Sequence, residues 1–274
     1  MATFDTAFEQ AIARSAPPSL KEARERQGAA TPMEKAFRAV EHFDFDPTRL
    51  VISATVVGEQ YRTLKANLVH FRESSGLGSI VFSSSVKGEG KTTVVVNIAR
   101  ELGREPGAKI AVVDCDFKRP GVGKFCGQEV ETGIEEVLAG EAPLGKCGIY
   151  SRRDNFCIFP VKKRPSETGE LLSSSAVQRV VGELEGLFDL VIFDTSPVLS
   201  TSEPLVLGAK TGGVIIVVRA NTTQRESVLF AQGQLEQAGC RLMGVVLNAR
   251  PSYVPRLWLL RKYEYFPDAY RYKA

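Results

Sequence analysis

The sequence of 274 residues lacks several features that mark common classes of protein. Its five cysteines are an odd number and form no C-x-x-C pair, which argues against both a disulfide scaffold and a zinc or iron–sulfur site. No stretch approaches the roughly 18 uninterrupted apolar residues of a membrane span, and the N-terminus has no apolar core of signal-peptide length. We therefore expect a protein of a reducing cytosol that is neither secreted nor membrane-spanning by itself.

The sequence also lacks a large excess of charge of either sign, since the formal net charge is only +3 at pH 7. The charge is unevenly placed, because residues 250–274 hold six basic and two acidic side chains and the rest of the chain is close to neutral. A basic end can attract an anionic membrane surface or an acidic partner, and it is equally common as an ordinary solvated end. We expect no nucleic-acid partner.

A repeated alternation of short apolar runs and helix-length stretches indicates the fold class. The runs are rich in β-branched residues and show no polar alternation, which is typical of strands covered on both faces. They read "SIVFSS", "KIAVVD", "NFCIFPV", "DLVIFD", "GVIIVVR" and "MGVVLN". The pattern predicts an α/β protein with a doubly wound, mostly parallel sheet and helices on both faces, of the P-loop NTPase type.

Three regions differ in composition. Residues 1–50 have no sustained apolar face, which predicts an irregular arm or linker. Residues 51–261 form the predicted domain, whose first helix, over residues 56–75, has an apolar stripe and an opposite charged face. Residues 262–274 hold four of the seven tyrosines between charged residues, which is typical of a mobile tail. The alternative is that these rings pin the C-terminus to the domain.

The first apolar run leads into a glycine-rich loop, "SSSVKGEGKTT", that ends where a helix is predicted. Phosphate binding needs free backbone N–H groups, a helix N-terminus, a lysine, and a hydroxyl for Mg²⁺. The loop supplies all four, although Ser85 stands where the general pattern G-x-x-x-x-G-K-[ST] has glycine. The expected nucleotide-binding residues are Gly88, Glu89, Gly90, Lys91, Thr92 and Thr93. A glycine-rich turn with a surface lysine is the alternative.

Polar side chains end three further runs. Asp114 and Asp116 leave the second run two residues apart, so they point to the same side if the chain stays extended. Asp194 ends the fourth run, where a carboxylate would hold Mg²⁺ or its waters. Asn248 ends the last run, and its amide suits an adenine edge. In parallel sheets ligands bind at this edge, although Asp and Asn also simply cap helices and end strands.

In this order, the loop and the strand-end carboxylates resemble the deviant Walker-type P-loop ATPases, which include the ParA/MinD proteins. More narrowly, residues 50–274 resemble the bacterial tyrosine kinases that serve as exopolysaccharide and capsule autokinases. Walker A corresponds to "SSSVKGEGKTT", Walker A′ to "VVDCDFKRP" and Walker B to "LVIFDTSPV". Lys118 stands where the Walker A′ pattern D-x-D-x-R has arginine. Val86 occupies the position of the ParA/MinD signature lysine, which favours the kinases.

The resemblance implies phosphoryl transfer from MgATP to tyrosine. It implies that the catalytic residues are Lys91, Asp114, Asp116 and Asp194, and that Thr92, Asp116 and Asp194 hold Mg²⁺. Asp114 is the candidate for accepting the phenol proton, but the sequence does not separate its role from that of Asp116. The implied phosphoacceptors, modified by a neighbouring subunit, are Tyr263, Tyr265, Tyr270 and Tyr272.

The resemblance also implies partners. The family's oligomerisation motif E-x-x-R-x-x-R corresponds to Glu59, Arg62 and Lys65, which predicts a homo-oligomer such as a ring, with Lys65 in place of an arginine. A separate membrane activator of the polysaccharide co-polymerase type would hold the cytoplasmic protein at the plasma membrane, where it regulates exopolysaccharide or capsule synthesis and export. Two other hypotheses stay open: a ParA/MinD-like ATPase switch without kinase activity, and a nucleotide-binding regulatory module without catalysis.

Overall fold

The computed structural model describes residues 31–51, 55–165, 168–172 and 174–249. Its strands are β1 (Arg38–Val40), β2 (Ser79–Ser84), β3 (Ile110–Cys115), β4 (Ile149–Ser151), β5 (Phe156–Phe159), β6 (Leu190–Thr195), β7 (Val214–Arg219) and β8 (Leu242–Asn248). Its helices are α3 (Pro32–Ala36), α4 (Val56–Ser75), α5 (Lys91–Leu102), α6 (Val122–Phe125), α7 (Ile134–Leu138), α8 (Leu144–Cys147), α9 (Thr168–Leu171), α10 (Ser174–Leu187), α11 (Glu203–Gly208) and α12 (Arg225–Gln237).

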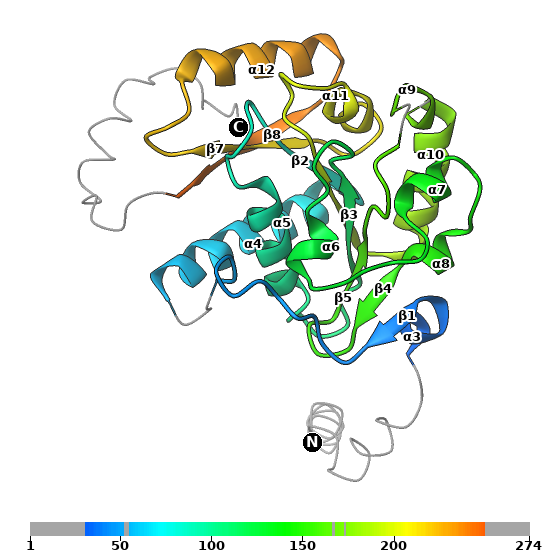
Figure 1. The fold of residues 1–274 in the computed structure, drawn as a ribbon. Coiled ribbons are helices and arrows are strands. Elements are labelled where there is room, and N and C mark those ends of the chain that lie inside the picture. The colour runs from blue at the N-terminus through cyan, green and yellow to red at the C-terminus, as the bar shows by residue number, and fades with distance from the viewer. Residues whose placement is uncertain (1–30, 52–54, 166–167, 173, 250–274) are drawn as a thin grey trace, which may run out of the picture.

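Within the described residues the strands form one eight-stranded sheet in the order β1-β4-β5-β3-β6-β2-β7-β8 (Figure 1). From β5 to β8 all neighbours are parallel, whereas β4 runs antiparallel to β5 and β1 is parallel to β4. The prediction of a doubly wound, mostly parallel α/β sheet is confirmed. The order places the carboxyl ends of β3, β6 and β2 side by side.

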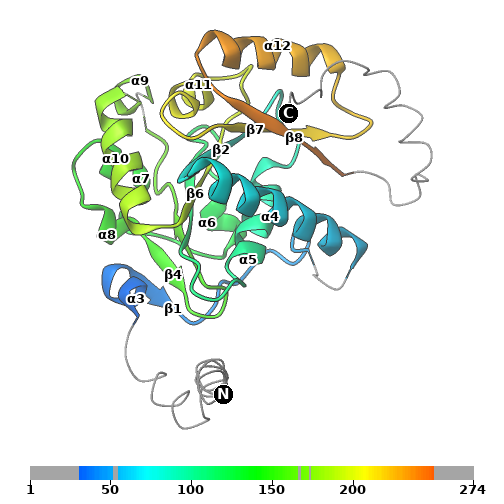
Figure 2. The same ribbon diagram turned by 180° about the vertical axis from the view of Figure 1, so that it is seen from behind.

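Apolar side chains on both faces of the central strands explain why helices cover both faces of the sheet. On β6, Val191 and Phe193 face a core shared with α7, α10 and α12, whereas Leu190 and Ile192 face a core shared with α4 and α5. Because successive strand residues point to opposite faces, a continuous apolar run fills both cores. Figures 1 and 2 show α4 and α5 packed together on their side of the sheet. Truncating a ring such as that of Phe193, which is 1% exposed, should cost about 3–5 kcal/mol of stability.

The two helices of the core shared by α4 and α5 begin in different ways. The Thr55 side chain accepts a hydrogen bond from Gly58 N at the start of α4, and Gly76, in the left-handed region at φ 64°, ends that helix. Helix α5 begins after Gly90 and has no side-chain cap. The N-terminal N–H groups of α5 are therefore left for another acceptor.

The prediction of an irregular arm over residues 1–50 is wrong for residues 31–50. These residues include α3 and β1, and β1 pairs with β4 from Arg38↔Ile149 to Val40↔Ser151. Phe37 and Phe43 are 5% and 3% exposed and belong to the two cores. A three-residue strand that begins with arginine has no readable apolar pattern, so only its tertiary pairing reveals it. The folded domain starts before residue 51, and the predicted tail at residues 262–274 lies outside the described residues.

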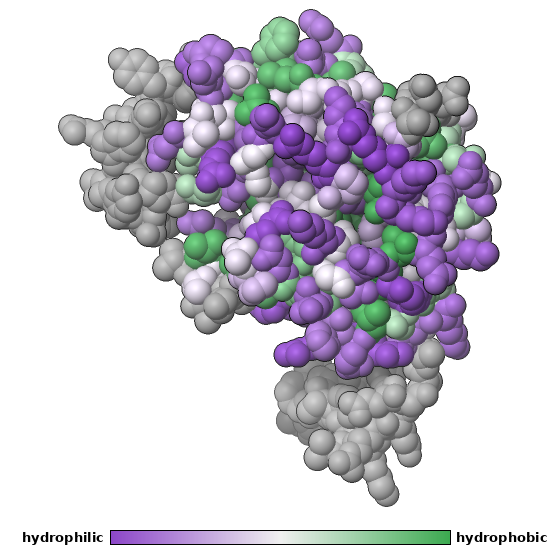
Figure 3. All heavy atoms as spheres, in the orientation of Figure 1, coloured by the Kyte–Doolittle hydropathy of each residue, from purple (hydrophilic) through white to green (hydrophobic). Residues whose placement is uncertain are grey.

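The surface seen in Figure 3 is largely hydrophilic, with small apolar areas that include one over α12. On that helix Leu229 and Phe230 are 52% and 63% exposed. Among the described residues, no helix has the length and apolar character needed to cross a membrane.

Candidate active site

The loop between β2 and α5 owes its shape to two glycines. Gly88 and Gly90 have φ angles of 83° and 92°, in the left-handed region that other residues rarely adopt. A side chain at Gly90 would also clash with the Nδ2 of Asn248. Helix α5 then begins with Lys91, which is 7% exposed, and its first backbone hydrogen bond runs from Val94 N to Gly90 O. The N–H groups of the first turn are thus available to an anion, as phosphate binding requires.

Glu89 is one of the predicted nucleotide-binding residues, but in the structure its side chain points inward and accepts hydrogen bonds from the loop itself. It is 1% exposed and accepts hydrogen bonds from Val86 N at 2.8 Å and from the hydroxyls of Ser85 and Thr223. Ser85, the residue that departs from the general loop pattern, thereby gains a partner within the loop. Only the backbone N–H of Glu89 is left to face a nucleotide, because its carbonyl also has a partner. Thr223 lies 134 residues away in sequence, so no local signal predicted this contact.

Asn248, predicted to read an adenine edge, also holds the loop. Its Nδ2 donates to the Glu89 carbonyl at 2.9 Å, and Arg219 Nη1 donates to the Gly88 carbonyl at 3.2 Å. The structure brings Asn248 to the predicted site, with its amide N–H directed at the loop backbone. The ends of β7 and β8 therefore fix the loop from one side.

Asp114 and Asp194 are partners on the neighbouring strands β3 and β6, and both are fully buried. Asp114 accepts three backbone N–H groups: Oδ1 from Asp116 at 3.1 Å, and Oδ2 from Gly121 at 2.8 Å and Val122 at 2.9 Å. Burial and the charge of Asp194 raise the pKa of Asp114 to about 8, although these N–H groups act in the opposite direction. Both oxygens of Asp114 are thus engaged in holding the Walker A′ loop.

Asp194 differs because neither of its oxygens has a hydrogen-bond partner among the described residues. Burial raises its pKa to about 7, and the positive charge of Lys91 acts in the opposite direction. The Thr92 hydroxyl is a near neighbour of Asp194 that makes no hydrogen bond to it. An unpartnered buried carboxylate is costly, and an oxygen-binding cation such as Mg²⁺ would relieve that cost. The residues present therefore fit the predicted metal.

Asp116 is the more accessible of the Walker A′ carboxylates, at 8% exposed. Its Oδ1 accepts from Arg119 N at 3.0 Å and from Ser196 Oγ at 2.8 Å, while its Oδ2 accepts no hydrogen bond from any described residue. Sequence reasoning missed Ser196, which follows β6 and carries no motif of its own. Lys118, at the arginine position of the motif, donates to the Ser200 carbonyl at 2.9 Å.

The predicted metal ligands do not form an all-protein cage. Among the described residues, no group of three or more His, Cys, Asp or Glu side chains is arranged to hold a metal ion. Mg²⁺ usually keeps several waters and binds substrate phosphates with one or two carboxylates. Thr92, Asp116 and Asp194 are a donor set of that kind.

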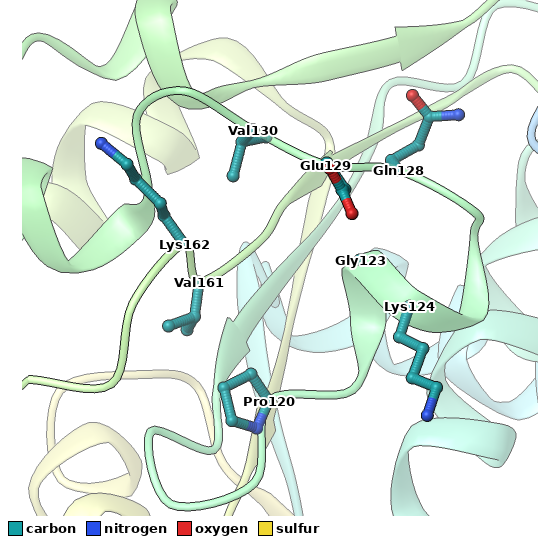
Figure 4. A pocket seen from close by; sticks show the side chains of 8 residues that line it. All are labelled: Pro120, Gly123, Lys124, Gln128, Glu129, Val130, Val161 and Lys162. Carbon is teal, nitrogen blue, oxygen red and sulfur yellow. The ribbon is translucent and has the colours of Figure 1, made fainter.

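A cavity of about 340 Å³ adjoins the Walker A′ loop (Figure 4). Pro120, Val130 and Val161 line it, and Lys124 and Lys162 lie on opposite sides. Lys162 pairs with Glu136 at 3.1 Å. None of the predicted site residues lines the cavity, so it is separate from the carboxylate site.

The remaining predicted residues lie away from the loop or outside the described part. Glu59 and Arg62 form an ion pair on the exposed face of α4, whereas Lys65 pairs with Glu105, which follows α5. The first two residues of the motif thus pair with each other, whereas the third, also on α4, pairs with a residue outside that helix. The four predicted phosphoacceptor tyrosines lie outside the described residues.

The fold, the glycine-rich loop and the strand-end carboxylates together define a P-loop ATPase. A family model described as an AAA domain matches residues 78–229, more than half of the chain, and the chain belongs to this family. Tyrosine-protein kinase YwqD of Bacillus subtilis is 27% identical over 192 residues, which cover 70% of this chain and 81% of that protein. Tyrosine-protein kinase wzc of Salmonella typhi is 25% identical, and the match covers 74% of this chain but only 27% of the relative.

Solved structures give the same result for the fold. The kinase domain of Escherichia coli tyrosine kinase ETK has a TM-score of 0.71 and 23% identity, covering 77% of this chain and 84% of that domain. Cobyrinic acid a,c-diamide synthase from Mycobacterium smegmatis, solved with an ATP analogue and magnesium, has a TM-score of 0.58, 20% identity and coverages of 69% and 80%. The predicted resemblance to the bacterial tyrosine kinases is confirmed, and the curated relatives are named as the enzyme class that the motifs predicted.

Proposed function

We propose that this protein is an ATP-dependent protein-tyrosine kinase. The observation that supports it best is the unpartnered, buried Asp194, which lies beside Asp114 and within reach of the Lys91 charge. Its strand, β6, is the neighbour of β2, which leads into the loop shaped for phosphate. Phosphoryl transfer needs mainly positioning and charge neutralisation, which such a site supplies. The curated relatives named as tyrosine-protein kinases support the choice of acceptor.

In the proposed reaction, Lys91 and the backbone N–H groups at the start of α5 hold the phosphates of ATP. Bound Mg²⁺, held by Thr92 and Asp194, would neutralise charge on the phosphate oxygens, and Asp116, the third predicted metal ligand, is left for the phenol proton. The tyrosine oxygen bonds to the γ-phosphorus, the bond to the β,γ-bridging oxygen breaks, and ADP leaves. The ATP analogue and magnesium in the cobyrinic acid synthase structure support these two ligands.

The phenol proton needs an acceptor, since a free tyrosine has a pKa near 10. The sequence left Asp114 and Asp116 as alternatives. We assign the proton to Asp116, because its Oδ2 has no partner among the described residues, whereas both oxygens of Asp114 accept backbone N–H groups. Asp114 is then a positioning residue for the Walker A′ loop.

We propose as substrate the C-terminal tyrosines of a neighbouring subunit, Tyr263, Tyr265, Tyr270 and Tyr272. A tethered segment reaches a high effective concentration at a neighbour's site without a dedicated pocket. The exposed Glu59–Arg62 pair on α4 would face the next subunit, and a membrane protein would act as activator in exopolysaccharide or capsule production.

The test is to incubate the purified protein with MgATP, with and without candidate membrane partners, and to map phosphotyrosine by mass spectrometry. We expect phosphate on the tail, abolished by Lys91→Met and strongly reduced when the four tail tyrosines become Phe. Tyr150→Phe is the matched control, because Tyr150 is buried and its hydroxyl bonds Asn155 at 2.9 Å. ATP turnover with an unmodified tail in every condition would contradict the kinase and favour the ATPase switch.

A mixing experiment separates transfer between subunits from transfer within one. The Lys91→Met protein has acceptor tyrosines but no competent active site. The protein with four tail phenylalanines has a competent active site but no acceptor tyrosines on its tail. Phosphate on the Lys91→Met chain after mixing supports transfer between subunits, and its absence refutes it.

The predicted contact between subunits has a test of its own. Glu59→Ala with Arg62→Ala should lower the oligomer size measured by light scattering, and an unchanged size would make α4 a packing surface only.

A further inference from the structure

The segment that leads from β1 to α4 is fastened to the first turns of α5 (Figure 1). Asn97, which is 2% exposed, donates from Nδ2 to the Arg49 carbonyl at 3.0 Å and accepts from Val51 N at 2.8 Å. At the other end of the segment, Asp46 N donates to the Phe125 carbonyl at 2.9 Å. The backbone around Arg49 is therefore held against both α5 and α6.

This fastening directs the Arg49 side chain to the start of α5. Its Nε donates to Thr93 Oγ1 at 3.3 Å, and its guanidinium carbon lies 4.6 Å from the centre of the Phe125 ring. Arg49 is partly buried, yet among the described residues no carboxylate lies within ion-pair distance of it, and its two terminal nitrogens donate no hydrogen bond. Arg100, which bonds the same segment, has Asp154 at 3.8 Å.

Thr93 is the third residue of α5, so its N–H belongs to the helix turn that would receive phosphate. A guanidinium in contact with that residue lies at the edge of the same anion site. Its planar donors suit phosphate oxygens, and such charge-assisted bonds are among the strong ones. The positive charge of Arg49 also lowers the pKa of Asp194, the unpartnered carboxylate of this site.

We propose that Arg49 is a nucleotide-binding residue that donates from its terminal nitrogens to the phosphates of bound ATP. The inference rests on the proposed nucleotide site and adds to it a cation from outside the Walker motifs. The anchored segment Asp46–Val51 thereby becomes one wall of the site. No sequence pattern indicates this role, because Arg49 lies in the region predicted to be an irregular arm or linker.

The experiment measures MgATP affinity by calorimetry for the full chain carrying Arg49→Met, Arg100→Met or Lys91→Met. We expect Arg49→Met to weaken binding about tenfold, the scale of one charge-assisted hydrogen bond. Its melting temperature without nucleotide should stay close to that of the unchanged protein, and the rise caused by MgATP should shrink. Arg100→Met loosens the same segment but keeps the Arg49 charge, so its affinity should change by less than about twofold.

Unchanged affinity in Arg49→Met would overturn the inference, and so would an equal loss in Arg100→Met, which would assign the effect to the segment's packing. If Arg49→Met does not fold, Arg49→Gln removes the charge while keeping a donor for Thr93, and the same tenfold loss is expected. The measurement needs no phosphotyrosine. Arg49-dependent MgATP binding without tail phosphorylation would refute only the kinase proposal, and normal kinase activity with Arg49-independent binding would refute only this one.

Discussion

The ends of β3 and β6 carry chemically identical side chains in opposite situations. Asp114 and Asp194 are neighbours across the two strands, and both are buried with raised pKa values, about 8 and about 7. Three backbone N–H groups surround Asp114, whereas neither oxygen of Asp194 has a partner among the described residues. One carboxylate therefore shapes a loop, and the other is left for a ligand.

The comparison teaches that burial alone does not identify a functional carboxylate. A buried charge whose lone pairs are filled by the fold stabilises the chain conformation around it. A buried charge without partners reduces stability until something binds, and such groups concentrate at functional sites. The two strand ends can be separated experimentally, because removing each charge should affect a different property.

The largest expected effect is on catalysis, from Asp194→Asn. Losing several kcal/mol of charge stabilisation should lower the rate of tail phosphorylation by about 10³-fold. The free energy of unfolding without nucleotide should not fall, since the substitution removes an unpartnered buried charge. Phosphotyrosine formation and denaturant unfolding measure the two quantities. A stability loss as large as that of Asp114→Asn would break the comparison.

The next effect is on stability, from Asp114→Asn. The amide NH₂ would face at least one of the N–H groups that the carboxylate now accepts, so the free energy of unfolding should fall by about 1–3 kcal/mol. Asp189→Asn is the matched control, because Asp189 accepts a single N–H, from Lys109 at 2.9 Å, at the opposite end of β6. We expect a loss of about 1 kcal/mol or less there.

The remaining effect is a pH dependence of the stability of the nucleotide-free protein. Both pKa values are raised above the ordinary 3.8, so between about pH 4 and pH 8 the folded state binds protons that the unfolded state has released. The free energy of unfolding should therefore decline as pH rises through this window. In Asp194→Asn the decline should be shallower, as followed by the melting temperature at pH 5, 6, 7 and 8. An identical slope in both proteins would refute the assignment to Asp194.

Much of this site followed from the sequence because its parts are local. A loop with glycines at positions 88 and 90, followed by Lys91, specifies a phosphate-binding turn within a few residues. The position where a buried strand ends can also be predicted locally, because the run of β-branched residues stops at Asp114 in one strand and at Asp194 in the other. The parallel sheet then brings these ends to one edge whatever the details of packing.

Other contacts depended on residues distant in the chain. One partner of Glu89 is the distant Thr223, and one partner of Asp116 is the distant Ser196. Arg49 contacts Thr93 from a segment that has no readable sequence pattern. Strand β1 is likewise visible only through its pairing with β4. Such contacts arise when separate elements pack, and no spacing along the chain records them.

The sequence by itself determined the class of fold and which residue types meet at the carboxyl edge of the sheet, because periodicity and strand-end chemistry are properties of short segments. Only the tertiary structure decided how those residues divide the work. It filled the lone pairs of Asp114 with backbone donors and left those of Asp194 empty. Hydrogen-bond satisfaction is a property of a packed neighbourhood, so two aspartates that read alike in sequence differ once the chain has folded.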